Sequence, residues 1–197
     1  MSGSSTRAGF VAPLDAVPAD GDALDDLLQP AISGITGLPG DLVRPRWQLT
    51  PPAQPAADVS WAAVGFTRSV PDAYPFQRFD GDADGGLGRM EATINEELSA
   101  LATFYGPASG ELAARLRDGL AISQNRDALR AAGLAFVSVG EATTLPDLVG
   151  QRWLRRVDVP LTFRRQITRS YAIRALRSAG GVIRPAGNNP NPWNVEP

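Results

Sequence analysis

The sequence predicts an α+β fold in which an antiparallel or mixed β-sheet is packed by two or three α-helices. Two observations lead to this prediction. Over residues 153–167 apolar side chains occupy most odd positions and polar side chains the even ones, which is typical of a strand with one packed face. Over residues 24–35 and 112–122 apolar residues instead recur at helical spacing. Strand-like and helical segments follow one another without an internal repeat.

The first predicted element is a helix that begins at Asp22 and ends before Gly37. Pro30 is expected to bend or break this helix, because a proline inside a helix removes a backbone hydrogen bond. Residues 43–50 then alternate between apolar and polar side chains, which predicts a strand. Pro45 places that strand at the edge of the sheet, since proline cannot donate to a central ladder.

Two longer strands and a loop are predicted next. Residues 59–70 carry apolar side chains on both faces, as a buried strand does. Prolines and glycines over residues 71–88 predict a long loop. Residues 89–104 alternate well enough to predict a strand, although the spacing of Met90, Ile94 and Leu98 also suits a helix.

The second half of the chain is predicted to add two helices and at least two strands. A helix over residues 112–122 is followed by a shorter one that Asn125 caps and that stops at Gly133. Residues 134–139 form a compact buried strand, which precedes the long strand over residues 153–167. Residues 171–183 are expected to supply a partner strand.

The chain is expected to form one domain between two extended arms. Residues 1–21 are rich in Ser, Gly, Ala and Pro, and residues 185–197 in Pro and Asn, so neither segment can bury enough surface to order itself. Residues 22–184 form the domain, and 43% apolar residues in the chain suffice for a sizeable core. No apolar run approaches the roughly 20 residues that span a bilayer, so we expect a soluble protein made in the cytoplasm.

The composition excludes most common kinds of catalysis. The sequence contains no Cys and no His, and all 19 basic residues are Arg, so it lacks the nucleophile, base and metal-ligand sets of most enzymes. The adjacent Glu96 and Glu97 would point to opposite faces of a strand and could not converge on one substrate. An enzyme based on carboxylates is therefore the least favoured hypothesis, and no cofactor is expected.

One segment matches the residue pattern of a calcium-binding loop. Asp80, Asp82 and Asp84 alternate before Gly85, and Glu91 stands in the twelfth place. Prolines and aromatic residues before Asp80 make a poor entering helix, and a Gly/Asp hairpin loop needs the same residues for its turn. A calcium-binding interaction module that uses residues 80–91 is the alternative function.

Charge is unevenly distributed along the chain. Residues 1–97 contain 14 acids and 6 arginines, a net charge of −8, whereas residues 98–197 contain 7 acids and 13 arginines, a net charge of +6. Such a subunit could pair its acidic surface with the basic surface of a neighbour, which suits head-to-tail contacts in a ring. The alternative is that both signs are interspersed on one folded surface.

Arginines are most frequent in residues 152–184, which carry nine of them and one acid. Arg156 and Arg164 fall on the predicted solvated face of the long strand, where no aromatic residue is available to stack on bases. We therefore favour an acidic protein partner over nucleic acid, because guanidinium groups suit ion pairs at interfaces. Candidate interface residues are Arg156, Arg164, Arg169 and, as an aromatic anchor in the C-terminal arm, Trp193.

Four stretches of the sequence carry a resemblance to a known family. They are Leu38-Pro39 with Val43-Arg44-Pro45-Arg46-Trp47, then Phe104-Tyr105-Gly106-Pro107, then Gln124-Asn125-Arg126-Asp127-Ala128-Leu129, and finally Arg152-Trp153 with Arg156 and Leu161-Thr162-Phe163. In their order and spacing they resemble the neck or tail-terminator proteins of tailed bacteriophages, over about residues 22–184.

The resemblance implies a non-enzymatic structural protein of the virion. Such a protein forms a ring, typically a hexamer, that caps the tail tube and offers a surface to the head-side connector. Its expected partners are further copies of itself, the tail tube protein and the connector or adaptor proteins, with no membrane. DNA is expected only to pass through the lumen of the ring.

Overall fold

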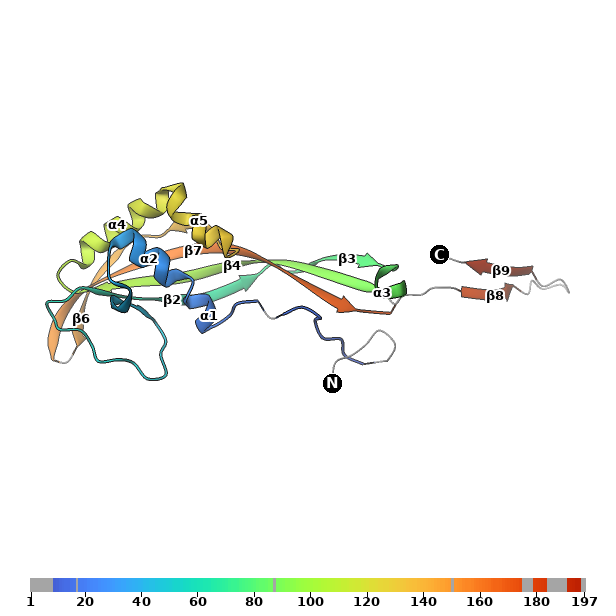
Figure 1. Cartoon of the computed structure of the whole chain (residues 1–197), viewed down its shortest axis with the longest axis horizontal. Coiled ribbons are helices and arrows are strands. Elements are labelled where there is room, and N and C mark those ends of the chain that lie inside the picture. The colour runs from blue at the N-terminus through green and yellow to red at the C-terminus, as the bar shows by residue number, and fades with distance from the viewer. Residues whose placement is uncertain are drawn as a thin grey trace. The chain divides into compact units, whose positions relative to one another are not determined.

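The structure is a computed structural model that describes residues 9–16, 18–86, 88–149, 151–174, 179–183 and 191–195. The chain divides into two compact units. Unit 1 consists of Met1–Ala16, Tyr74–Ile94 and Thr168–Pro197, and unit 2 of Val17–Ala73 and Asn95–Ile167. Two long strands, β4 (Arg89–Tyr105) and β7 (Arg152–Ala172), contribute residues to both units (Figure 1).

A mixed sheet forms the framework of unit 2. Its strand order is β1-β2-β4-β7-β5, and β6 also pairs with β7. β1 runs parallel to β2, whereas β2 with β4, β5 with β7 and β6 with β7 are antiparallel. The remaining strands of this unit are β1 (Val43–Pro45), β2 (Trp61–Pro71), β5 (Ala135–Val139) and β6 (Thr143–Val149).

Helices cover one face of this sheet (Figure 1). They are α1 (Asp22–Asp25), α2 (Leu28–Thr36), η1 (Gly40–Leu42), α4 (Ser109–Ala121), η2 (Ser123–Arg126) and α5 (Asp127–Ala131). Leu28 of α2 and Leu116 of α4 are almost fully buried against sheet residues such as Phe104 and Phe163. The hydrophobic core of unit 2 therefore lies between the helices and the sheet, and it leaves the opposite sheet face free for polar side chains.

Unit 1 contains a hairpin and a second, small sheet. β3 (Phe76–Asp80) pairs antiparallel with the start of β4, and the short helix α3 (Ala83–Gly86) lies in the connection. The end of β7 receives the segment around Pro13, which forms a bridge to Tyr171. β8 (Ala179–Ile183) and β9 (Asn191–Val195) pair antiparallel.

The predicted fold class is confirmed: a mixed seven-stranded sheet is packed by the helices α2, α4 and α5. The strands expected over residues 89–104 and 153–167 are found as β4 and β7, and both are longer than expected. No helix among the described residues is long and apolar enough to cross a membrane.

Three local predictions are wrong. Pro30 does not break a helix: the chain breaks earlier, at Asp26 and Leu27, and Pro30 lies in the first turn of α2, where backbone N–H groups have no helical partner. The loop predicted over residues 71–88 contains strand β3, whose aromatic residues pair along β4. The partner strand expected over residues 171–183 is not found among the described residues of that range: β7 itself extends to Ala172, and β8 (residues 179–183) pairs with β9.

The edge strand predicted over residues 43–50 is shorter than expected. β1 lies at the edge of the sheet, as Pro45 indicated, but it ends at that residue. The alternation beyond Pro45 therefore does not reflect a packed face. Trp47 and Leu49 are instead exposed on the segment that leads to β2.

Candidate interface site

Four side chains form a ladder across four neighbouring strands of unit 2. The rings of Trp61 on β2 and Tyr105 on β4 are stacked, with centroids 4.3 Å apart and planes 12° from parallel. Arg44 of β1 lies 5.6 Å from the Trp61 centroid, and Arg156 of β7 lies 6.0 Å from the Tyr105 centroid. Because the strand order is β1-β2-β4-β7, a guanidinium group covers each outer face of the stacked pair.

Strand register and one glycine place this ladder. Trp61 and Tyr105 are direct cross-strand partners, which brings their side chains together on one face. The next residue, Gly106, has φ of 94°. A Cβ atom there would lie 2.7 Å from the carbonyl oxygen of Val59, so only glycine lets the chain pass this closely. The Gly106 N–H donates to the carbonyl of Arg155 at 3.1 Å and fixes the end of β4 to β7.

A second row of polar groups lies beside the ladder. Arg156 donates to both oxygens of Asp158, with Nε–Oδ1 and Nη2–Oδ2 distances of 2.8 Å, and approaches Asp147 at 3.5 Å. Arg46 donates to the hydroxyl of the buried Thr103 at 3.1 Å. Burial alone would raise the pKa of Asp158, but hydrogen bonds from Arg156 and Thr103 outweigh it and lower that pKa. Asp158 is therefore the anionic centre of this row.

Arg44 and Arg46 differ from Arg156 because neither has a carboxylate partner among the residues that the structure describes. Arg44 donates to the backbone carbonyls of Asp41 at 3.3 Å and Ala53 at 2.9 Å. These bonds hold the side chain in place without neutralising its charge. The site therefore contains two arginines without a direct carboxylate partner among the described residues, although the charge of Arg46 helps to lower the pKa of Asp158, and we expect the site to attract anionic groups.

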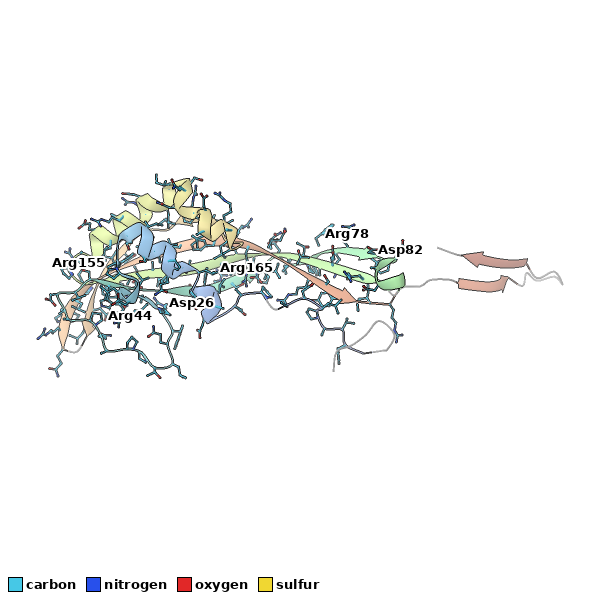
Figure 2. The ribbon with its side chains drawn as sticks, viewed as in Figure 1. Asp26, Arg44, Arg78, Asp82, Arg155 and Arg165 are labelled. Atoms are coloured by element: carbon cyan, nitrogen blue, oxygen red, sulfur yellow. The ribbon has the colours of Figure 1, made fainter. Side chains whose placement is uncertain are left out.

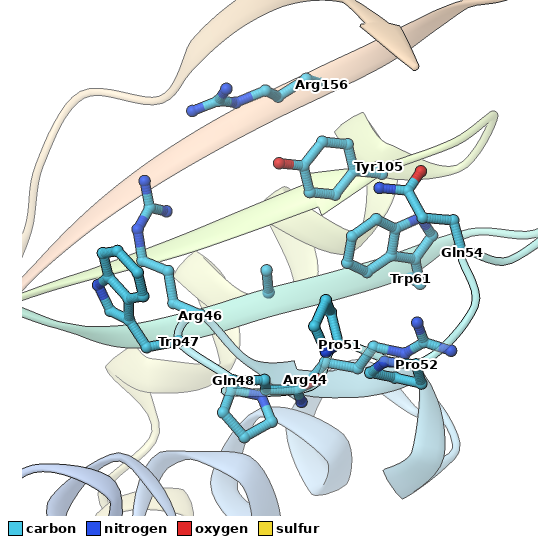
Figure 3. Close-up of a pocket in the computed structure, with 12 residues that line it drawn as sticks. Arg44, Arg46, Trp47, Gln48, Pro51, Pro52, Gln54, Trp61, Tyr105 and Arg156 are labelled. Carbon is cyan, nitrogen blue, oxygen red and sulfur yellow. The ribbon is translucent and has the colours of Figure 1, made fainter. Parts of the chain in front are cut away.

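These side chains line a pocket of about 490 Å³ in unit 2 (Figure 3). The guanidinium groups of Arg46 and Arg156 and the hydroxyl of Tyr105 point into the same space. The segment between β1 and β2 supplies the opposite wall through Pro51, Pro52 and Gln54. Trp47 lies at the rim with 77% of its surface exposed. We call this cavity the arginine pocket.

The sequence-predicted interface residues do not gather in one place. Arg156 lines the arginine pocket, whereas Arg164 lies eight residues further along β7, a distance of about 26 Å in an extended strand. The side chain of Arg164 is 61% exposed, and its Nε lies 3.9 Å from Glu97. Arg169 is half-buried in unit 1. The backbone of Trp193 belongs to β9, and its side chain lies outside the part of the chain that the structure describes.

Arg165, an arginine of β7 that was not among the predicted interface residues, is also held by an ion pair. Arg165 and Glu96 form an ion pair of 2.8 Å, with 12% and 15% of their side chains exposed. Arg165 also donates to the carbonyl of Ala19 at 2.6 Å (Figure 2). The basic second half of the chain is thus partly neutralised within unit 2 by the acidic first half.

The carboxylates of the calcium-like loop are engaged with neighbouring protein groups. Asp84 pairs with Arg89 at 2.6 Å, and Oδ1 of Asp80 accepts the backbone N–H groups of Asp82 and Ala83. Strand β3, not a helix, leads into the loop. Among the described residues, no three carboxylates converge in a way that could hold a metal ion.

A family model described as phage neck terminator protein matches residues 22–187. The chain belongs to the phage neck terminator family. A comparison with curated proteins gave no match. Family membership confirms the expected structural, non-enzymatic role in the phage neck and tail, and it makes the neck terminator a component of the virion that contacts other tail and neck components.

Sequence reasoning missed the arginine pocket, although it had singled out its parts. Three of the four stretches that carried the family resemblance, around residues 43–47, 104–107 and 152–163, supply pocket residues of the neck terminator. The missing step was strand order, which no local pattern specifies. The four residues of the ladder are widely separated in the sequence, and only the order of the strands brings them together.

Proposed function

We propose that this neck terminator assembles into a ring of six copies that caps the tail tube and joins it to the head-side connector. The observation that carries the proposal is the arginine pocket of a protein with a structural role in the neck. Arg44 and Arg46 are held in place by hydrogen bonds yet lack carboxylate partners among the described residues. A surface prepared in this way is suited to an acidic protein partner.

Exposed apolar side chains support the same proposal. Large contiguous patches of exposed apolar side chains mark interaction surfaces. Unit 2 exposes Trp47, Leu49 and Trp153 by 77%, 103% and 70%, and unit 1 exposes Tyr74 and Phe76 by 87% and 72%. Contacts with neighbouring subunits and with the tube would cover such groups.

The ring contacts that we propose are head-to-tail. A contact of this kind joins two different surfaces of one subunit type, and it closes into a ring when the rotation between copies allows. The net charges of −8 on residues 1–97 and +6 on residues 98–197 favour such pairing. DNA passes through the lumen in this proposal and is not held by the pocket.

Arg164, Arg169 and Trp193 are the further contact residues of the proposal. Arg164 is the most exposed of the β7 arginines whose ion pairs are described. Residues 1–21 and 185–197 are proposed as arms that reach from the domain of residues 22–184 to neighbouring proteins. Assembly takes place in the host cytoplasm before the finished ring enters the virion.

Measurement of the native mass tests the proposal. The full chain is measured alone and then with its tail tube protein. A ring former gives one defined oligomer, or assembles when it meets the tube, and electron microscopy then shows a ring at the tube end. A protein that stays monomeric in both conditions, and leaves tube length uncontrolled, contradicts the proposal.

A further inference from the structure

We infer that the arginine pocket of one copy binds the β3–β4 hairpin tip, residues 79–84, of a second copy. This inference rests on the proposed ring and deepens it by naming the two surfaces that meet. Each copy carries both surfaces, one in unit 2 and one in unit 1. Repetition of the same contact from copy to copy is the head-to-tail arrangement that a ring requires.

The pocket is suited to a carboxylate. Arg44 and Arg46 have donors to spare and no carboxylate partner among the described residues. Burial raises the pKa of Tyr105, so its hydroxyl remains a hydrogen-bond donor at neutral pH. Several donors that face one cavity favour an acceptor with two oxygens, and carboxylates and guanidinium groups match in this respect.

The same geometry disfavours nucleic acid bases. Proteins that bind single strands stack bases on free aromatic faces. Here Trp61 and Tyr105 stack on one another, and Arg44 and Arg156 cover their outer faces. The pocket therefore offers donors and ring edges, which suit an acidic peptide segment better than a base.

The hairpin tip carries an exposed carboxylate that could pair with the arginines of the pocket. Phe79 beside the turn is exposed by 53%, whereas Tyr74 and Phe76, exposed by 87% and 72%, lie toward the other end of β3. Asp82 is exposed at the tip, and its carboxylate has no ion pair within the described part of the chain (Figure 2). An exposed aromatic ring, Phe79, three residues from a free carboxylate complements a positive cavity whose rim carries the exposed Trp47.

Asp82 is the group that reaches the pocket, because the neighbouring carboxylates already have partners within their own subunit. Asp84 is paired with Arg89, and Asp80 accepts two backbone N–H groups of its own loop. These interactions of Asp80 and Asp84 stabilise the conformation of the loop. Of the three aspartates in this loop, Asp82 is thus the one whose carboxylate makes no hydrogen bond or ion pair with a neighbouring protein group among the described residues.

Disulfide trapping between copies tests the inference, since the chain contains no cysteine of its own. Ala83→Cys places a thiol on the hairpin tip and Gln54→Cys places one on the pocket wall, and neither change removes a charge that the inference uses. The two variants, one of them carrying a size tag, are mixed and oxidised. A mixed disulfide can form only between two copies, so a contact within one chain cannot imitate it.

We expect a disulfide-linked heterodimer that is lost when Arg44→Ser and Arg46→Ser are added to the pocket variant. Ser123→Cys, an exposed position on η2 outside the pocket lining, is the matched control and should give no heterodimer with Ala83→Cys. A chain bearing both Ala83→Cys and Gln54→Cys should give a ladder of linked oligomers up to the ring number.

Failure of this inference and failure of the proposed ring are distinguishable. A defined oligomer without the cross-link overturns the hairpin contact and leaves the ring standing. Monomers in every condition overturn both. Binding of labelled single-stranded DNA that disappears in the Arg44→Ser and Arg46→Ser variant identifies a nucleic acid site and overturns the inference.

Discussion

Arg156 and Asp158, two residues apart on the same face of β7, form a bidentate ion pair in which both Nε–Oδ1 and Nη2–Oδ2 measure 2.8 Å. Only 25% and 14% of their side chains are exposed. Arg156 also lies over the ring of Tyr105. Its charge is therefore compensated within the subunit, where Arg156 forms part of the wall of the arginine pocket.

The first prediction separates Arg156 from Arg164. Arg156→Glu should lower the free energy of unfolding by about 2 kcal/mol or more, because it breaks a partly buried pair and leaves Asp158 facing a like charge. Arg164→Glu should leave the subunit folded and weaken assembly, since Arg164 is 61% exposed and its nearest acid lies 3.9 Å away. Denaturant unfolding and native mass measure the two effects.

Arg152→Glu, at an exposed position of the same strand, controls for the reversal of charge itself. If Arg156→Glu unfolds at the same denaturant concentration as the unsubstituted protein, the ion pair with Asp158 does not contribute to stability. Normal assembly of Arg164→Glu removes Arg164 from the proposed interface.

A second prediction compares two adjacent arginines that face two adjacent glutamates. Arg165→Ala should destabilise unit 2 by about 2 kcal/mol, because it leaves the poorly exposed Glu96 without its partner. Arg164→Ala should change stability by less than about 1 kcal/mol, since its pair with Glu97 is long and exposed. Thermal or denaturant unfolding of both variants gives the comparison. Equal losses would show that burial does not distinguish the two pairs.

Periodicity in the sequence was sufficient for the elements with a clear packed face. The long strand and helix α4 follow from alternation and helical spacing because unit 2 buries one side of each. β3 was missed for the opposite reason. All its residues are exposed, so hydrogen bonding to β4 rather than burial defines it, and the prolines that precede it predict a loop.

The site could be predicted only in part, because it depends on contacts between distant residues. An excess of arginine on β7 is visible in the sequence, but the carboxylate that each arginine meets is not. Arg165 on β7 pairs with Glu96 on β4, whereas Arg44 and Arg46 meet no carboxylate among the described residues. The partners follow from strand register, which short-range patterns do not specify.

The third prediction concerns Asp25, which is 9% exposed on α1. Burial raises the pKa of Asp25, although its carboxylate accepts the N–H of Phe66 at 2.7 Å. A carboxyl group whose pKa is raised on folding favours the native state in its protonated form. This stabilisation is fully present below the pKa of an ordinary aspartate and is lost as the pH rises through the raised pKa of the folded protein. Asp25→Asn keeps an acceptor for Phe66 and removes this loss.

Asp25→Asn should therefore raise the melting temperature at neutral pH and raise it less, or not at all, in acid. Asp26→Asn, at the exposed neighbouring position, should show no such dependence on pH (Figure 2). Melting curves of the three proteins over a series of pH values make the test. A gain for Asp25→Asn that is larger in acid than at neutral pH contradicts the assigned sign.

The fourth prediction is that calcium does not affect the folding of unit 1. Asp84 forms an ion pair with Arg89, and Asp80 accepts two backbone hydrogen bonds from its own loop. These carboxylates therefore already have partners within the protein. Melting temperatures with excess calcium and with chelator should agree. A rise of several degrees that saturates with calcium would show binding to the native state and favour the calcium-binding module.

The last prediction concerns the C-terminal arm and its anchor Trp193. Pro190 and Pro192 cannot donate backbone hydrogen bonds, and residues 191–195 are extended as strand β9, paired only with β8 among the described residues. An extended segment with one large aromatic residue is suited to reach a partner, and a buried aromatic anchor contributes on the order of 2 kcal/mol to an interface. Truncation after Arg184 should leave the fold of unit 2 intact and weaken ring formation or attachment at the head side. Trp193→Ala alone should reproduce most of that loss, whereas Asn194→Ala, the adjacent polar position, should not. If the truncated subunit assembles and yields infectious particles at normal levels, the arm has no role in docking.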